Sequence, residues 1–365
     1  MNLHKLTALV KRLLSERSYK TRREFLVGRV TSRLNNLSGD TSSALTSTEK
    51  KEIDDYYRRF GLQPSTHNFH EFYKRVTGKF SPEYLTEDLY YHKIDRYFND
   101  WDAAKYLDNK TLYRILFPDV PQPELLVFRQ NGFWFDSAGQ PMTESAMQGI
   151  VGKEEYLFVK AARESYGGHG VKYLRGKDVA DYTTEYKEDV VIQKPLRQSA
   201  LLAQINPSSV NTVRILTLLR KDGSVRICSK ILRMGIGSAK VDNASSGGIT
   251  VGINDDGTLK DTAYFVSGKK YKHHPTTGVK FSTVKLPSLD KAVSMVSRQA
   301  NLLPYFRLVS WDIAFDETDN PVLIEANLCD GELDFHQINN GPVFGEETAE
   351  VLSEVFGLDA CKKNG

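Results

Sequence analysis

The chain has 365 residues, 40% of them hydrophobic and 26% charged, a composition typical of a globular protein with two or three core-forming units. It contains neither a long apolar run nor an apolar leader with a small-residue cleavage site, so we expect no transmembrane helix and no signal peptide. The three cysteines, Cys228, Cys329 and Cys361, lie far apart, which favours reduced thiols and a cytoplasmic location.

The net charge of +3 is unevenly distributed along the chain. Residues 1–34 hold nine basic and two acidic residues, a sum of +7, so the rest of the chain sums to −4. The basic excess therefore belongs to one N-terminal segment and not to a nucleic-acid-binding face of the whole protein. We expect no nucleic-acid partner.

The N-terminal segment has the pattern of amphipathic helices. One helix is predicted over Asn2–Glu16 and a second over Thr21–Leu34, and the first has apolar residues at helical spacing, namely Leu3, Leu6, Val10, Leu13 and Leu14. A basic amphipathic helix can lie on the anionic inner face of a membrane, or it can pack on its own domain with a solvated outer face. Both alternatives stay open for residues 1–34.

Residues 1–103 are expected to form a helical region. After a polar loop at 35–47, three more helical patterns span Thr48–Phe60, with Thr48 as N-cap, His67–Thr77 and Pro82–Asn99. No alternation of strands and helices precedes about residue 110, and the many Tyr and Phe side chains are expected to form the core of this region.

Strand patterns begin after residue 104. We predict a short helix over Thr111–Phe117, a hairpin over Leu125–Arg129 and Gly132–Phe135, a helix over Met142–Ile150 and a buried strand over Tyr156–Lys160. We expect one domain over residues 104–355, followed by a loose tail over 356–365.

A glycine-rich loop, RESYGGHG at residues 163–170, separates the Tyr156–Lys160 strand from a second strand at Val171–Leu174. Glycines allow backbone N–H groups to approach phosphate oxygens, with Lys160 as a point charge and Ser165 and His169 as further donors. The loop matches neither the P-loop nor the dinucleotide fingerprint, and an ordinary hairpin turn is the alternative.

The stretch VVIQKPL at residues 190–196 indicates an apolar strand that ends in a hinge near 193–197. The backbone of Gln193, Lys194, Pro195 and Leu196 can face an adenine edge while Leu196 packs on the ring, and a plain strand end is the alternative.

Further along the chain, Arg214 lies between apolar residues. A partly buried arginine needs an anion, either the terminal phosphate with its developing charge or a structural carboxylate.

Three later features add candidate residues. The predicted strand Ser224–Leu232 carries Lys230, which we consider a candidate catalytic residue together with Arg214. The polar loop HHPTTG at 273–278 contains His274 as a candidate substrate contact, with a solvent-exposed histidine as the alternative. The small-residue loop KVDNASSGG at 240–248 suits close backbone approach to a substrate at Asp242, Asn243, Ser245, Ser246 and Gly247.

The stretch LVSWDIAFDETDNPVLIEAN at 308–327 predicts two strands, Leu308–Phe315 and Pro321–Asn327, around a turn. Side chains two apart share a face, so Glu325 and Asn327 point the same way, and symmetric pairing places Asp312 opposite Glu325. Two carboxylates and an amide oxygen suit Mg²⁺, which fills its other positions with phosphate and water. A surface hairpin is the alternative, against which the flanking apolar runs argue.

Taken in order, several of these motifs resemble the ATP-grasp superfamily over about Ala104–Gly345, namely Lys110, Lys160 with SYGGHG, QKPL, Arg214, WDIA and LIEAN. More narrowly, NPSSVNTVRI, VDNASSGG and HHPTTG resemble the sugar-transfer-associated ATP-grasp family. The order of the motifs is more specific than any one of them.

The resemblance implies an ATP-grasp fold, in which two α+β subdomains grip ATP, preceded here by a helical region. It implies that Lys110 and Lys160 hold the phosphates, that the hinge receives adenine and that Lys194 replaces a glutamate usual in the family. It further implies that the loop over the phosphates contains Gly167, Gly168 and Gly170, and that Mg²⁺ binds to Asp312, Glu325 and Asn327.

The predicted activity is that of an ATP- and Mg²⁺-dependent carboxylate–amine ligase that acts through an acyl phosphate. Its substrates are expected to be a small carboxylate and an amine or amino acid, and its product a modified glycan precursor or cell-surface metabolite. The glycan link rests on the resemblance alone. The alternatives are an ATP-grasp kinase for a sugar or alcohol hydroxyl and a nucleotide-binding scaffold of glycan biosynthesis.

Overall fold

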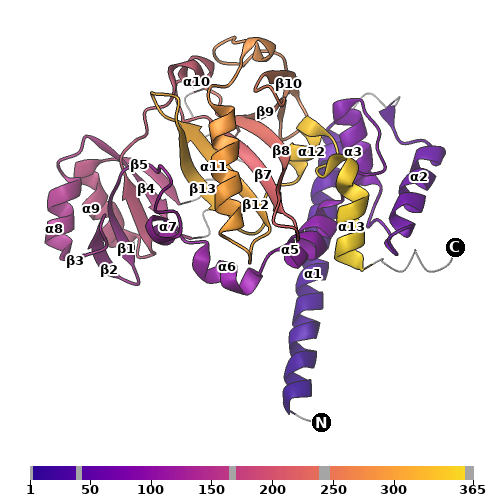
Figure 1. Ribbon diagram of the computed structural model, residues 1–365, viewed down its shortest axis with the longest axis horizontal. Helices are drawn as coiled ribbons and strands as arrows, with labels where there is room; N and C mark the ends of the chain where they lie inside the picture. The colour runs from indigo at the N-terminus through magenta and orange to yellow at the C-terminus, as the bar shows by residue number, and fades with distance from the viewer. Residues whose placement is uncertain (1–2, 38–42, 164–169, 238–246, 358–365) are drawn as a thin grey trace. The chain divides into compact units, whose positions relative to one another are not determined.

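The computed structural model describes residues 3–37, 43–163, 170–237 and 247–357, with side chains from Ser18 onward (Figure 1). The chain divides into two compact units. Unit 1 comprises residues 1–98, 267–269 and 332–365, and unit 2 comprises 99–266 and 270–331. The predicted domain boundary at 103/104 stays a prediction, and residues 332–355, which were predicted to belong to the second domain, fall in unit 1.

Unit 1 is helical. Its elements are α1 (Leu3–Asn36), α2 (Ser47–Arg58), α3 (Asn68–Thr77), α4 (Glu87–Leu89), the π-helical turn η2 (Tyr90–Ile94), α5 (Asp95–Phe98), α12 (Asp334–Asn340), the 3₁₀ turn η7 (Gly345–Glu347) and α13 (Thr348–Phe356). Among the described residues no helix combines the length and apolarity needed to cross a bilayer. Membrane contact through residues 1–34 and a cytoplasmic location stay predictions.

Two details of unit 1 differ from the sequence-based expectation. The two predicted N-terminal helices are one continuous helix, α1, because no Pro or Gly interrupts residues 16–21. The N-cap of α2 is Thr46 and not Thr48. Thr46 Oγ1 accepts a hydrogen bond from the Glu49 N–H at 3.2 Å, and the Glu49 side chain accepts from the Thr46 N–H at 2.7 Å, which is a capping box.

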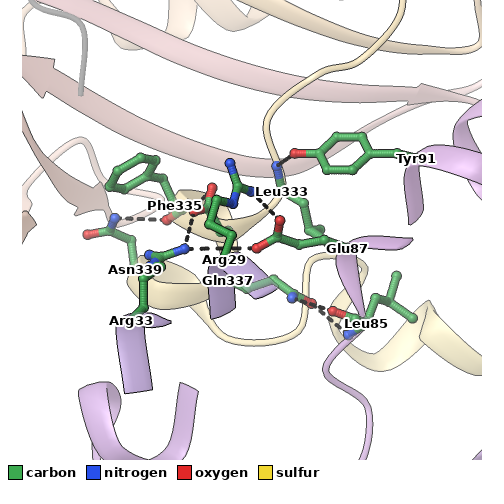
Figure 2. Close-up of polar contacts among 10 residues, drawn as sticks. Arg29, Arg33, Leu85, Glu87, Tyr91, Leu333, Phe335, Gln337 and Asn339 are labelled. Carbon is green, nitrogen blue, oxygen red and sulfur yellow. Dashed lines mark hydrogen bonds and ion pairs between the residues drawn. The ribbon is translucent and has the colours of Figure 1, made fainter. Parts of the chain in front are cut away.

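A buried charged cluster ties α1 to the rest of unit 1 (Figure 2). Arg33 Nη1 donates to Asp334 Oδ2 at 2.8 Å, and Arg29 forms an ion pair with Glu87. Glu87 and Asp334 are 1% and 4% exposed, so each carboxylate depends on its arginine for compensation. Burial would raise the pKa of Asp334, but the charges of Arg33 and Arg29 outweigh it and lower that pKa.

Unit 2 contains both sheets, and every pair of neighbouring strands in each is antiparallel. The smaller sheet has the order β3-β2-β1-β6-β4-β5. Its strands are β1 (Leu125–Gln130), β2 (Phe133–Asp136), β3 (Pro141–Met142), β4 (Tyr156–Ala161), β5 (Val171–Arg175) and β6 (Val190–Gln193). Helices α8 (Glu144–Val151) and α9 (Gly176–Glu185) cover one face of it (Figure 1).

The larger sheet has the order β11-β10-β9-β8-β7-β12-β13. Its strands are β7 (Thr212–Leu219), β8 (Val225–Met234), β9 (Ile249–Ile253), β10 (Leu259–Phe265), β11 (Lys270–Tyr271), β12 (Leu308–Phe315) and β13 (Pro321–Asn327). Helix α11 (Leu289–Asn301) crosses one face of this sheet (Figure 1). Short helices complete the unit, namely α6 (Trp101–Leu107), η3 (Lys110–Leu112), α7 (Tyr113–Leu116), α10 (Ala200–Ile205) and η6 (Phe281–Thr283).

The two faces of the larger sheet differ in chemistry. Val213, Ile215 and Trp311 share an apolar core with Ala292 and Val296 of α11. Because side chains alternate along a strand, the intervening residues face the other way. We call that opposite side the polar face and define it by Arg214, Arg233, Asp312, Glu325 and Asn327. The α11 core thus fixes the strands that present these polar groups.

We expect the charged cluster of unit 1 to be energetically coupled. Arg33→Met and Asp334→Leu should each lower the free energy of unfolding by about 3–5 kcal/mol, because each leaves a buried charge without its partner. The double variant should lose much less than the sum, as measured by urea unfolding. The exposed pair of Arg58 and Asp55 is the control and should contribute about 0–1 kcal/mol. Additive losses at Arg33 and Asp334 would contradict the coupling.

Candidate functional site

The hairpin of β12 and β13 places the three predicted metal ligands on the polar face. Asp312 pairs with Glu325, and Ser310 pairs with Asn327, so the predicted register is confirmed. The register shifts between Asp312 and Ile313, directly beside the acids. Such a bulge re-aims side chains locally and is common next to functional sites.

Asp312 is bound by two arginines. Arg214 donates to it twice, from Nε to Oδ1 at 2.7 Å and from Nη2 to Oδ2 at 2.8 Å, and Arg233 Nη1 donates to Oδ2 at 2.7 Å. Burial would raise the pKa of Asp312, but the charges and hydrogen bonds of the two arginines outweigh it and hold that pKa well below its ordinary value. Asp312 is therefore ionised and fixes the direction of both guanidinium groups.

Glu325 is paired with Lys110, whose role was predicted from the family resemblance alone. Lys110 Nζ donates to Glu325 Oε1 at 2.6 Å, and the Lys110 N–H donates to the carbonyl of Ala162 at 2.9 Å. Ala162 directly follows β4, the strand that carries Lys160. Lys110 thus links the predicted metal-binding strand to the strand that carries the second predicted phosphate-binding lysine.

Asp108 belongs to the same cluster and was missed by the sequence analysis. Burial and the nearby charge of Glu325 raise the pKa of Asp108 to about 7, against the lowering effect of Lys110. The neighbouring Tyr113 hydroxyl accepts a hydrogen bond from the Ala326 N–H at 2.9 Å, which holds this segment against β13. Nothing in the sequence around Asp108, two residues before Lys110, indicates that its side chain lies near Glu325.

The donor set fits a hard cation bound together with a nucleotide. The bonds from Arg214 and Arg233 use three of the roughly four lone-pair positions of the Asp312 carboxylate. Asn327 Nδ2 donates to the Ser310 carbonyl at 3.1 Å, which orients the amide and its oxygen. Among the described residues no three His, Cys, Asp or Glu side chains gather into a metal site. A cation here would therefore depend on phosphate and water for most of its ligands, as Mg²⁺ commonly does.

The second phosphate-binding candidate and the hinge lie in the smaller sheet. Lys160 pairs with Val191 and Val171, and Phe158 pairs with Gln193. Lys194 Nζ lies 2.9 Å from Glu124 and 3.4 Å from Glu154. The hydrogen bond to Glu124 raises the pKa of Lys194. The side chain of Lys194 thus points toward acidic side chains of its own unit. The contact of Gln193–Leu196 with adenine stays a prediction.

The glycine-rich loop lies mostly outside the described residues, including Ser165, Gly167, Gly168 and His169. Its last residue, Gly170, has φ +80°, and a Cβ atom there would lie 2.7 Å from the Cβ of Ala161. Gly170 therefore has to be glycine, because both its conformation and the close strand approach exclude a side chain.

Lys230 is not brought together with Arg214. In the observed register Arg214 pairs with Ile231, and Lys230 pairs with Ile215 on the α11 side. Lys230 Nζ donates to Asp255 Oδ1 at 2.6 Å. The sheet thus places the Lys230 and Arg214 side chains on opposite faces, and the catalytic role predicted for each of them stays a prediction.

The predicted substrate loops are only partly described. Asp242, Asn243, Ser245 and Ser246 lie outside the described residues, and Gly247 adopts φ +97°. His274 is 1% exposed, and its Nε2 lies 2.9 Å from the Gly235 carbonyl. The buried ring of His274 thus supports the segment that follows β8, and its contact with a substrate stays a prediction.

Asp108 gives the protein a testable pH dependence. Its folded-state pKa of about 7 lies above the ordinary value of 3.8, so the folded protein holds this proton more tightly than the unfolded chain. Asp108 should therefore make the free energy of unfolding fall as the pH rises from about 4 to 7. Denaturant unfolding across this range should show a flatter dependence for Asp108→Asn, and an unchanged slope would exclude the assignment.

Solved structures that resemble the chain include two ligases and a synthetase. The ATP-grasp ligase PsnB with its minimal precursor is 14% identical, with a TM-score of 0.41, over 70% of this chain and 64% of its own. An L-amino acid ligase from Bacillus licheniformis is 14% identical, with a TM-score of 0.40, over 69% and 48%. D-alanyl-alanine synthetase A from Vibrio cholerae is 13% identical, with a TM-score of 0.39, over 70% and 66%.

The chain thus spans about half to two thirds of the length of these structures. No curated protein matches its sequence. The family model described as sugar-transfer associated ATP-grasp matches residues 90–352, which include both sheets of unit 2 and the polar face. The chain belongs to the sugar-transfer associated ATP-grasp family and has the α+β fold of the ATP-grasp superfamily.

Proposed function

We propose that the protein is an ATP- and Mg²⁺-dependent ligase that joins a carboxylate to an amine through an acyl phosphate. The proposal rests on the polar face. There Asp312, which is held by Arg214 and Arg233, pairs with Glu325, and Glu325 forms an ion pair with Lys110. Together with Lys110, the polar face brings together three cationic side chains, two carboxylates and one amide. Such a set can neutralise a triphosphate and a substrate carboxylate at the same place.

The proposed reaction has two steps. A carboxylate oxygen of the acceptor attacks the γ-phosphorus of ATP, and the bond between that phosphorus and the β–γ bridging oxygen breaks as ADP leaves. The amine nitrogen then attacks the carbonyl carbon of the acyl phosphate. The carbon–oxygen bond to phosphate breaks, and the nitrogen loses a proton. Both steps depend chiefly on positioning and on neutralisation of charge.

The residues of this chain have distinct parts in the proposal. Lys110 and Lys160 bind the phosphates, and Arg214 binds the terminal phosphate and the charge that develops as it transfers. Asp312, Glu325 and Asn327 hold Mg²⁺, which when bound neutralises phosphate charge and polarises the transferred group. Asp312 also keeps both arginines in a fixed direction.

The acceptor is proposed to be a glycan precursor or a related cell-surface metabolite, and the donor an amino acid or another amine. The support is the description of the matched family, which is associational. A kinase acting on a hydroxyl group uses the same first step with a different nucleophile. Product analysis therefore has to decide between the two activities.

We expect release of ADP and phosphate to require both a carboxylate and an amine. Incubation with ATP, Mg²⁺ and panels of sugar acids and amino acids, followed by mass spectrometry, should reveal an amide product. Phosphate that stays on the acceptor would contradict the ligase and indicate a kinase.

Glu325→Gln should lower turnover at least about 100-fold, because it removes a charged metal ligand and the partner of Lys110. Steady-state ADP release measures the change, and circular dichroism checks the fold. Glu317→Gln, in the turn of the same hairpin, is the control, since Glu317 is exposed. Equal turnover of wild-type protein and Glu325→Gln would remove Glu325 from the site.

The Lys110–Glu325 pair also predicts competition between a lysine and a cation. Lys110→Met should tighten binding of Mn²⁺ in the absence of nucleotide about tenfold, because Glu325 loses its competing charge, and should weaken binding of ATP. Titration calorimetry measures both affinities. Lys105→Met is the control, since Lys105 is exposed and pairs with Asp102. A parallel loss of both affinities would contradict the competition.

A further inference from the structure

Helix α1 is one continuous helix of 34 residues, and its two halves differ in where their apolar residues lie around the helix axis. We propose that the first half, residues 3–17, binds an anionic lipid surface, while the second half, residues 18–36, packs on unit 1. The two alternatives that the sequence left open for residues 1–34 thus apply to different halves of one helix. The assignment does not depend on the proposed ligase function.

The second half of α1 packs on unit 1 through one side. Leu26, Val30 and Arg33 are 4%, 1% and 8% exposed. At 3.6 residues per turn, these three positions lie within about 60° of one another around the axis. Tyr19 lies on the same side, and its ring meets the ring of His92 edge to face, with 4.6 Å between the centroids. These residues define what we call the packed side of α1.

The opposite side of the second half is exposed. Phe25, Gly28 and Ser32 occupy this side, about 140° around the axis from the packed side. All three residues are exposed, and Phe25 is 64% exposed. A Cβ atom built at Gly28 would have no neighbour within 4 Å among the described atoms outside the adjoining turns of the helix. We call this the open side of α1.

The apolar residues of the first half follow the open side. The sequence has leucine or valine at six positions with helical spacing, namely Leu3, Leu6, Leu9, Val10, Leu13 and Leu14. On the continuous helix their mean position lies about 170° from the packed side and within about 60° of the open side. Figure 1 shows this half extending beyond α2, α3 and α13 of unit 1. The apolar stripe therefore needs a partner other than the surface that binds the packed side.

The charge of the first half indicates the kind of partner. Residues 3–17 contain four basic residues and one acidic residue, a sum of +3. Lys5 and Lys11 occupy positions about 120° to either side of the middle of the stripe, and Arg12 lies nearly opposite the stripe. Flanking lysines can extend to anionic headgroups while leucines enter the boundary of the acyl region. This combination favours a helix that lies in the plane of an anionic bilayer surface.

A second copy of the helix fits the same stripe less well. Two first halves packed along their stripes would bring positively charged flanks together, and like charges at close range repel. Anionic phospholipids neutralise these charges instead, and each basic residue near such a surface strengthens binding about fivefold. Charge complementarity thus favours the lipid surface over self-association.

The test is sedimentation of the full chain with lipid vesicles. The wild-type protein should bind vesicles of phosphatidylcholine with about one third phosphatidylglycerol at least about tenfold more tightly than pure phosphatidylcholine. Added salt should weaken this binding. Leu6→Gln combined with Leu13→Gln should lower the partition coefficient about 100-fold, because two leucines are lost from the stripe. Leu302→Gln is the matched control, since Leu302 is 66% exposed in unit 2.

Two further variants test the orientation of the helix. Val10 lies in the stripe, and Arg12 lies about 160° away from it around the axis. Relative to the wild-type spectrum, Val10→Trp should add fluorescence that shifts to the blue with the anionic vesicles, and Arg12→Trp should add fluorescence that does not shift. Equal shifts for both variants would contradict the proposed orientation.

The remaining outcomes are distinct. Circular dichroism and thermal unfolding check that the variants keep the fold. If the wild-type protein does not sediment with the anionic vesicles, or if the double leucine variant sediments equally well, the proposal is overturned. A wild-type dimer in light scattering that dissociates in the double leucine variant, without vesicle binding, would also overturn it and assign the stripe to a second copy. The ligase function is unaffected by each of these results.

Discussion

The organisation of the site depends on one carboxylate, that of Asp312, in the middle of the larger sheet. It accepts hydrogen bonds from Arg214 and Arg233 and pairs through the backbone with Glu325. A buried charge of this kind is tolerated only with close partners, and those partners therefore have fixed positions. Because α11 fills the other face with apolar side chains, the strands cannot slip without exposing that core. Apolar packing against α11 on one face of the sheet thus fixes the positions of the charged side chains on the polar face.

Charge compensation also unites the elements that surround the polar face. Lys110 precedes the smaller sheet in the chain, yet its side chain pairs with Glu325, 215 residues later. Asp108, two residues before Lys110, lies near enough for the charge of Glu325 to raise its pKa. Among the groups predicted to bind metal or phosphate, Lys110 is thus paired with Glu325, and Arg214 is paired with Asp312. A nucleotide that binds together with its cation would replace these protein partners, and the net charge of the site would change little.

Local patterns in the sequence predicted much of this arrangement. The strands of the hairpin at 308–327, and the pairing of Asp312 with Glu325, match the prediction because alternation and turn residues are encoded within a short segment. The hairpin of β1 and β2 and the strands on both sides of the glycine-rich loop were predicted for the same reason. The helices α9 and α12 were not predicted.

The remaining features depend on contacts between distant residues. Arg233 reaches Asp312 across 79 residues of sequence, and no spacing rule connects them. The position of Lys230 depends on the register of β7 and β8, and a shift of one residue would have placed it with Arg214. Thr46 displaces Thr48 as the cap of α2 because Glu49 returns its hydrogen bond, although both threonines suit the position. Sequence reasoning thus selected the correct strands and could not select every side chain that meets between them.

The central claim is that ATP phosphorylates a carboxylate on the polar face, and oxygen labelling tests it most directly. An acceptor labelled with ¹⁸O in its carboxylate would be converted in the presence of ATP, Mg²⁺ and an amine, and the released phosphate analysed by mass spectrometry. The account predicts one ¹⁸O atom in each released phosphate, since the acyl phosphate transfers a carboxylate oxygen to it. Released phosphate without ¹⁸O would contradict the account.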